Sequence, residues 1–355
     1  MKKLSLLLVV GVMASFLLFL ALVGSVWAAQ EKFELKLASE YADKHPTVVN
    51  GFMPWIKKVQ ELSGGRLVIH FFNPNTLCPA KEVYASTVAG AVDMGASPIH
   101  WVHGKFPLSE AVQLPFLFNG SEAGSLTIWE LYKRFPEWRD EYKEIKVLWQ
   151  WTSALIQLHT RKKLVRTLED LPGMRIITWN PQENGMVKAL GANPVEGKPM
   201  DTYLALERGL ADGVVCPIAP MRSFKITDAT KYHTIINLMV AGFWAGMNPG
   251  KWNSLSPDLK KILEDTTGDK MAQISGKTLD EGSINDAKWM KDQGHSFYVL
   301  PANEKNRWRE RVENVDDEWL KKMETKGYKT AKKVYETTVS LGKEYSAKTA
   351  GGFKE

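Results

Sequence analysis

The stretch Leu168-Glu-Asp-Leu-Pro-Gly-Met-Arg-Ile-Ile-Thr-Trp-Asn-Pro181 predicts a tight turn that leads into a short strand. Pro172 and Gly173 mark the turn, and the β-branched run that follows them is typical of a strand. The final proline ends the strand because its ring removes a backbone hydrogen-bond donor. Arg175 and Ile177 are two residues apart, so both lie on one face of this strand.

Strands and helices alternate on both sides of this unit. Before it we predict strands at 33–38, 66–72, 90–94, 146–151 and 156–159, with helices at 46–62 and 81–89. After it we predict helices at 183–190 and 201–208 and a short strand at 214–215. This alternation of strands and helices is typical of an open parallel α/β sheet. It begins a second time at 146–151, which predicts two α/β lobes with a cleft between them. Ligands of such sheets bind beyond the carboxyl ends of the strands.

The last third of the chain is mainly helical. Ser256 with Pro257 after it is a good helix start, and helical periodicity then continues to about Gln293. A strand at 297–300 and amphipathic helices at 303–326 and 330–348 follow. A helical segment of this length exceeds that of an ordinary globular helix.

The N-terminal segment indicates export. Lys2 and Lys3 precede an uncharged run that ends in Val26-Trp27-Ala28-Ala29. A basic start, an apolar core and a small-residue end predict a signal peptide at 1–28, cut after Ala28, and therefore a periplasmic protein. The apolar run is long, so an uncleaved anchor that holds a sensor domain is the alternative.

The composition excludes several classes of protein. The chain has 355 residues, of which 44% are hydrophobic and 24% are charged, so it can bury cores for two domains. Without the predicted signal peptide, 44 basic residues face 40 acidic ones, and the two signs are interleaved. This pattern does not favour a nucleic-acid partner. Cys78 and Cys216 are far apart in the sequence, and we expect two free thiols.

No catalytic motif is recognisable. The chain has no nucleophile elbow, no phosphate-binding loop and no dinucleotide-binding fingerprint after a strand. His100 and His103 are three residues apart with Glu110 nearby, but no second cluster completes a metal site. We therefore expect a binding protein without a cofactor or metal, and an exported enzyme is the alternative.

Seven short motifs, in order, carry a resemblance to a known family. They are His45-Pro46, Ser63-Gly-Gly-Arg66, Gly90-Ala-Val-Asp-Met94, Leu114-Pro-Phe-Leu-Phe118, Asp170-Leu-Pro-Gly-Met-Arg175, Leu190-Gly-Ala192 and Ala205-Leu-Glu-Arg-Gly-Leu-Ala-Asp-Gly213. Together they resemble the solute-binding proteins of tripartite ATP-independent periplasmic (TRAP) transporters, of the dicarboxylate-binding type. The resemblance covers residues from about 30 to 350.

The resemblance implies a periplasmic binding protein fold, with two α/β lobes and a long helix that spans both. On this basis we place the first lobe at 29–150 plus about 240–285. The second lobe takes about 151–239 plus 286–355, with the C-terminal helices. The implied function is capture of a small organic solute between the lobes and its delivery to TRAP membrane permease subunits. Closure follows because the solute contacts both lobes only in the closed form.

The residues that the family uses to hold a carboxylate are replaced. The resemblance places the family's carboxylate-binding arginine at Ile177 and its asparagine contact at Cys216. Arg175 falls on a supporting lysine position, where it is either a displaced clamp or a surface arginine. An organic acid remains the solute that the family implies. A neutral, aromatic or amine solute is the alternative, because only a planar guanidinium fork grips a carboxylate with two parallel bonds.

Aromatic residues are numerous near the predicted strand ends. Of the 13 tryptophans, Trp101, Trp149, Trp151, Trp179 and Trp244 fall at strand tips or loops, and at least two should line the cleft. Glu40 and Tyr41 follow the first strand, while Asn180 and Glu183 follow the strand at 174–178. The predicted ligand-binding set is Glu40, Trp101, Trp151, Arg175, Ile177, Trp179, Asn180, Cys216 and Trp244. Aromatic walls with a carboxylate suit an aromatic solute or a cation held over rings.

Overall fold

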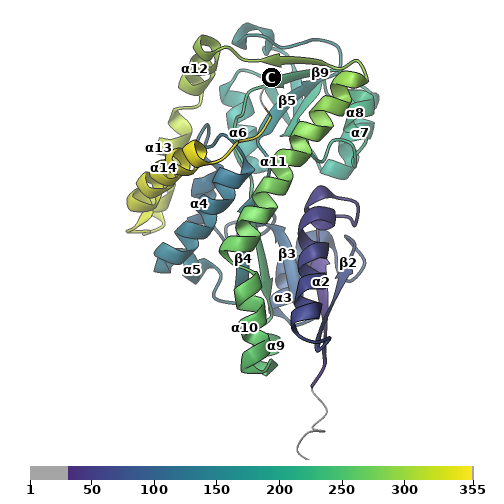
Figure 1. Cartoon of the computed structure of the whole chain (residues 1–355). Helices are drawn as coiled ribbons and strands as arrows, with labels where there is room; N and C mark the ends of the chain where they lie inside the picture. The colour runs from purple at the N-terminus through teal and green to yellow at the C-terminus, as the bar shows by residue number, and fades with distance from the viewer. Residues whose placement is uncertain (1–30, 354–355) are drawn as a thin grey trace, which may run out of the picture.

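The computed structural model describes residues 31–353, which form two β-sheets flanked by helices. The two sheets lie in separate lobes, and the helix α11 (Asp269–Asp292) runs alongside both (Figure 1). This is the two-lobe α/β fold, with a long helix spanning both lobes, that the sequence predicted. The predicted signal peptide lies outside the described residues.

The first sheet has five strands in the order β2-β1-β3-β10-β4. β1 pairs in parallel with β2 and β3, whereas β10 is antiparallel to both β3 and β4. The carboxyl ends of β1, β3 and β4 therefore lie at the same edge as the amino end of β10. The bounds are Phe33–Ser39 (β1), Leu67–Phe72 (β2), Met94–Pro98 (β3), Lys146–Thr152 (β4) and Gly242–Met247 (β10).

The second sheet has six strands in the order β11-β9-β5-β8-β6-β7. β6 is parallel to β7 and β8, and β5 is antiparallel to β8 and β9. The chain crosses between the sheets three times: after β4, after β9, and between β10 and β11, where α11 lies on the connection. The bounds are Ile156–Thr160 (β5), Arg175–Thr178 (β6), Asn193–Glu196 (β7), Gly213–Pro217 (β8), Tyr232–Ile235 (β9) and Ser296–Val299 (β11).

Helices cover both sheets. Within residues 31–353, no helix is sufficiently long and apolar to cross a membrane. The α-helices are Met53–Leu62 (α2), Val83–Val88 (α3), Ser121–Arg134 (α4), Pro136–Glu141 (α5), Pro181–Ala189 (α6), Pro199–Glu207 (α7), Ile226–Ala229 (α8), Pro249–Ser254 (α9), Pro257–Thr266 (α10), Asp269–Asp292 (α11), Ala302–Arg311 (α12), Asn314–Thr325 (α13) and Ala331–Lys348 (α14).

Some predicted element boundaries were wrong, and glycines explain two of them. The third strand begins at Met94 rather than at Gly90, because Gly90 has a φ of 75° and belongs to the turn that ends α3. The helix predicted from Ser256 is broken into α10 and α11 at Gly268, which has a φ of 62°. The helix predicted at 303–326 is likewise two helices, α12 and α13.

The long helix α11 is tied closely to α4. A Cβ added to Gly276 would lie 2.6 Å from the Glu122 Cα, so only glycine allows the two helices to approach this closely. Asp280, also on α11, accepts hydrogen bonds from the Ser121 and Glu122 backbone N–H groups at the start of α4 (2.8 and 2.9 Å). These contacts fix one half of α11 against the first lobe.

Candidate functional site

The segments that follow β1 and β8 meet at α11. A Cβ added to Gly282 would lie 3.5 Å from Pro46, which follows β1, and 3.8 Å from the Ala219 Cβ, which follows β8. The carboxyl ends of one strand from each sheet therefore converge on the long helix. Since open α/β sheets bind ligands at such ends, we take this region as the candidate site.

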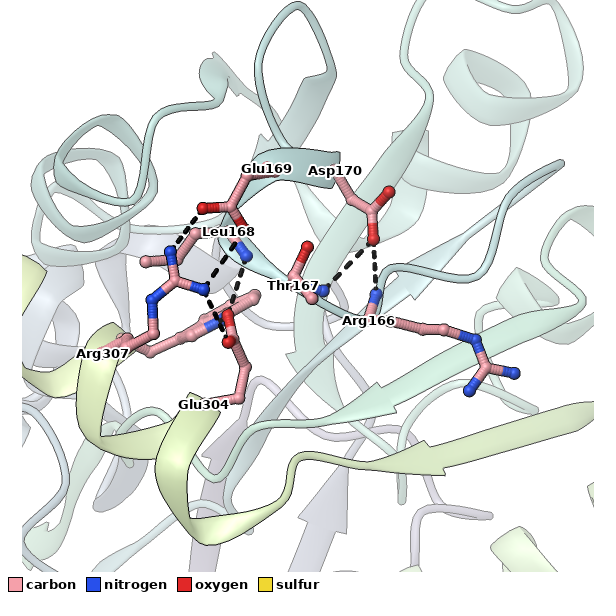
Figure 2. Close-up of polar contacts among 8 residues, drawn as sticks. Arg166, Thr167, Leu168, Glu169, Asp170, Glu304 and Arg307 are labelled. Carbon is pink, nitrogen blue, oxygen red and sulfur yellow. Dashed lines mark hydrogen bonds and ion pairs between the residues drawn. The ribbon is translucent and has the colours of Figure 1, made fainter.

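The turn that precedes β6 is held by a network of carboxylates (Figure 2). Asp170 accepts the backbone N–H groups of Arg166 and Thr167 at 2.8 and 3.2 Å, which completes a capping box. Glu304, on α12, accepts the Leu168 N–H at 2.9 Å. This network fixes the position from which β6 starts, and with it the residues at the far end of the strand.

Arg307 and Trp308, on α12, complete the surroundings of Glu304. Arg307 donates from Nη1 to the second carboxylate oxygen of Glu304 at 2.8 Å and also pairs with Glu169. The Trp308 indole donates to Glu304 Oε1 at 3.0 Å. Both carboxylate oxygens of Glu304 thus have hydrogen-bond partners, although the residue is buried, with only 5% of its surface exposed.

The carboxyl end of β6 carries Trp179, Asn180 and Glu183. Asn180 caps α6 by accepting the Glu183 N–H at 2.8 Å, and its own amide donates to Glu183 Oε1 at 2.6 Å. Trp179 donates from its backbone to Glu183 Oε2 at 2.5 Å and from Nε1 to Thr202 Oγ1 at 2.9 Å. Burial raises the pKa of Glu183 to about 8, because the carboxylate loses its hydration.

No charge at the carboxyl end of β6 comes from Ile177, Cys216 or Arg175. Ile177 and Cys216 are both buried in one apolar cluster of the second lobe. Arg175 begins β6, at the end of the strand away from Trp179, and its guanidinium donates to Asp212 (3.1 and 3.2 Å) and to the Gly209 carbonyl (2.8 Å). This contact favours the surface-arginine interpretation of Arg175.

The first lobe contributes Glu40 and a group of rings at the ends of β1, β4 and β10. Tyr41 stacks on His45 with ring centroids 4.0 Å apart, and it lies 5.7 Å from Phe243. Phe243 in turn stacks on Trp151 at 5.2 Å. Glu40 and Tyr41 are partly exposed, whereas the other three rings are buried. Oε1 of Glu40 is buried and accepts no hydrogen bond.

The remaining predicted tryptophans differ in where they lie: only Trp149 is next to this group. Trp244 is fully buried and packs edge-on against Tyr84 at 5.2 Å, in the cluster on the other face of the sheet from Trp151. Trp149 is fully buried beside Trp151, with centroids 5.9 Å apart. Trp101 is partly exposed in the loop after β3, next to the ring of His100.

Three buried histidines, which no sequence motif predicted, form a hydrogen-bonded chain next to β8. His159 and His233 share a bond between their Nδ1 atoms at 2.8 Å, and His233 Nε2 bonds His295 Nδ1 at 2.8 Å. His159 Nε2 lies 3.1 Å from the Cys216 carbonyl, to which it must donate. Only sheet pairing brings His159 opposite His233, so no local motif signals the cluster.

Within residues 31–353, no group of three or more His, Cys, Asp or Glu side chains is arranged to hold a metal ion. Cys78 and Cys216 are both free thiols, as predicted. A surface hollow of about 390 Å³ lies between α4, β4 and the start of α11, but it contains none of the predicted site residues.

Comparisons with known proteins agree with this geometry. The family model for bacterial extracellular solute-binding proteins, family 7, matches residues 38–323. The 2,3-diketo-L-gulonate-binding periplasmic protein of Escherichia coli is 26% identical over 58% of this chain, which spans 63% of that relative's length. The C4-dicarboxylate-binding periplasmic protein of Rhodobacter capsulatus is 26% identical over 86% of this chain and 91% of its own.

A solved structure gives the same result for the fold. A TRAP solute-binding protein from Rhodoferax ferrireducens, crystallised with copurified benzoate, superposes with a TM-score of 0.85. The two chains are 26% identical, and the match covers 90% of this chain and 100% of the other.

Proposed function

The chain belongs to family 7 of the bacterial extracellular solute-binding proteins, and we propose that it captures a small organic solute between its lobes and delivers it to TRAP membrane subunits. The observation that carries this proposal is the convergence of the segments after β1 and β8 on Gly282 of α11. A solute held there touches residues of both sheets at once. It therefore stabilises the closed arrangement by the contacts that only closure supplies.

The lobes in this proposal follow the two sheets. The first lobe takes 29–150 plus about 240–285, and the second takes about 151–239 plus 286–355. The membership of β1–β4 and β10 in one sheet, and of β5–β9 and β11 in the other, supports this division. The helix α14 packs along α4, so the C-terminal segment also joins the second lobe to the first.

Two solute classes are candidates. An organic acid is favoured by the relatives, since one is named for C4-dicarboxylates and a structural neighbour holds benzoate. A solute without a carboxylate is favoured by the buried, apolar Ile177 and Cys216 and by the engagement of Arg175 with Asp212. An aromatic ring is compatible with both classes, because Tyr41 and Trp179 are partly exposed at the two sides of the site.

A solute screen on the mature protein tests the proposal. Differential scanning fluorimetry against organic acids, aromatic compounds and amines should identify a class that raises the melting temperature with increasing concentration. Calorimetry should then give a stoichiometry of one, and chromatography should recover the solute unchanged after long incubation. Chemical conversion of the solute would instead support an exported enzyme.

A further inference from the structure

Glu40 stands out because one oxygen of its carboxyl group is buried without a hydrogen-bond partner. Oε1 is buried and accepts no hydrogen bond, and Glu40 forms no ion pair with any residue of the described range 31–353. Burial raises the pKa of Glu40 well above its ordinary value, against the opposing effect of a hydrogen bond from Tyr41. Buried carboxyl groups are ordinarily paired or hydrogen-bonded, so this one lacks a positively charged or donor group.

The rings beside Glu40 favour a cation. Tyr41 follows Glu40 directly and packs with His45 and Phe243. His45 is neutral at physiological pH, because burial lowers its pKa to about 3. The faces of these aromatic rings carry negative electrostatic potential, which attracts an ammonium group. Trp151 adds a further ring, and its Nε1 has no hydrogen-bond partner.

The second lobe contributes a carboxyl group and apolar side chains to its side of the site. Glu183 is also a buried carboxyl, and it too forms no ion pair with another described residue. Ile177 and Cys216 are apolar and buried. Arg175, the arginine on β6, is already paired with Asp212. Each side of the site thus carries a carboxyl group, and the unpartnered oxygen of Glu40 is the acceptor that complements a positively charged solute.

We propose that Glu40 binds a protonated amine of the solute, and that the solute class is a small organic amine with an aromatic or apolar body. This inference rests on the proposed function and names its ligand chemistry. The ammonium group supplies the donor that Oε1 lacks, and the partly exposed ring of Tyr41 contacts the adjoining carbon atoms. On binding, the positive charge of the ammonium lowers the pKa of Glu40, so the ionised carboxylate becomes its counter-ion.

The test uses matched pairs of solutes that differ in charge. The probes are benzylamine with benzoate, phenethylamine with phenylpropanoate, and choline with 3,3-dimethylbutanol as its neutral analogue. Binding to the mature protein is measured by calorimetry at pH 7 for the wild type, for Glu40→Gln and for Glu34→Gln. Glu34 lies on β1, the strand that precedes Glu40; its side chain is 61% exposed and pairs with Lys32, so it controls for the loss of a charge.

We expect at least one amine to bind more tightly than its acid or neutral counterpart. Glu40→Gln should weaken that amine at least tenfold, and Glu34→Gln should leave it unchanged. Tyr41→Leu should weaken the same amine without changing the melting temperature of the free protein by more than a few degrees. This second variant keeps the inference testable if Glu40→Gln folds poorly.

Two results would overturn the inference and are distinguishable from each other. Tight binding of acids only, unaffected by Glu40→Gln, would show that Glu40 is not the solute anchor while leaving the proposed function intact. The absence of binding by every acid, amine and neutral probe would count against both the amine and the capture of a small organic solute.

Discussion

Glu304 and Glu40 are two carboxyl groups removed from water, and their surroundings differ completely. Glu304 is 5% exposed and accepts hydrogen bonds from Leu168 and Arg307 (Figure 2). It also accepts one from the Trp308 indole. Glu40 has a buried oxygen with no partner at all. The first carboxyl holds a turn and a helix together within one lobe, whereas the second is available to an external group. The difference separates a structural buried charge from a candidate binding residue.

The largest effect is expected when the satisfied carboxyl is removed. Glu304→Ala leaves the Leu168 N–H and the Trp308 indole without an acceptor in a buried place, so the free energy of unfolding should fall by about 3 kcal/mol. Urea unfolding followed by circular dichroism measures this value. Glu169→Ala, which removes an exposed partner of the same Arg307, is the control and should cost less than 1 kcal/mol. Equal losses in the two variants would contradict the structural role given to Glu304.

The histidine chain is a third arrangement, buried and bonded but without charge. Burial lowers the pKa of His159 to about 4, below the ordinary value of 6.5. Between these two pH values His159 is protonated in the unfolded chain but not in the folded protein. The free energy of unfolding therefore falls as the pH drops from about 6.5 towards 4. For this residue alone we expect a loss of about 2 kcal/mol between pH 7.5 and pH 5.

A pair of variants checks this pH dependence. His159→Gln should reduce the loss of unfolding free energy between pH 7.5 and pH 5, because one group no longer takes up a proton on unfolding. His70→Gln is the control, since His70 lies on β2 in the other sheet, outside the histidine chain, and its side chain is 47% exposed. If the free energy of unfolding has the same pH dependence in the wild type and in His159→Gln, the three histidines are not neutral in the folded protein.

A smaller effect is expected on the second-lobe side of the site. Trp179→Ala should weaken the tightest solute by about 1 kcal/mol, the scale of one stacking contact. Calorimetric titration measures the change. Trp252→Ala is the control, because Trp252 packs against Lys146 on the first lobe and outside the candidate site. Unchanged affinity in Trp179→Ala would remove this residue from the site.

The smallest effect concerns the free protein and the unpartnered carboxyl itself. The folded-state pKa of Glu40 is raised, so the folded chain holds a proton that the unfolded chain releases above about pH 4.5. The stability contributed by this group is therefore lost as the pH rises. Glu40→Gln cannot ionise, so its stability relative to the wild type should increase from pH 5 to pH 8. A constant difference across this range would show that Glu40 is well solvated.

The sequence predicted the architecture because the relevant signals are local. The turn at Pro172-Gly173, the apolar strands and the helix start at Ser256-Pro257 each depend on neighbouring residues, and all appear in the structure. The break at Gly268 was missed, because a glycine within a periodic helical pattern does not reveal its φ. The strands β9 and β10 were also missed, since their pairing partners lie far away in the sequence.

The site was less predictable for the same reason. That Trp151 and Trp244 lie on opposite faces of the first sheet follows from the register of β4 with β10, which the sequence alone does not fix. The bond between Arg175 and Asp212 joins residues 37 positions apart. Glu40 was named from its place after a strand, but its missing partner is visible only once the surrounding rings are packed.

The most direct test of the role of Glu40 counts protons. Calorimetric titration of the wild type with its tightest amine, in buffers of different ionisation enthalpy at pH 6.5, measures how many protons are exchanged on binding. Burial raises the pKa of Glu40 and pairing with an ammonium lowers it, so the wild type should release protons on binding and Glu40→Gln should release fewer. Binding with no proton release in the wild type, or with the same release in Glu40→Gln, would contradict the account.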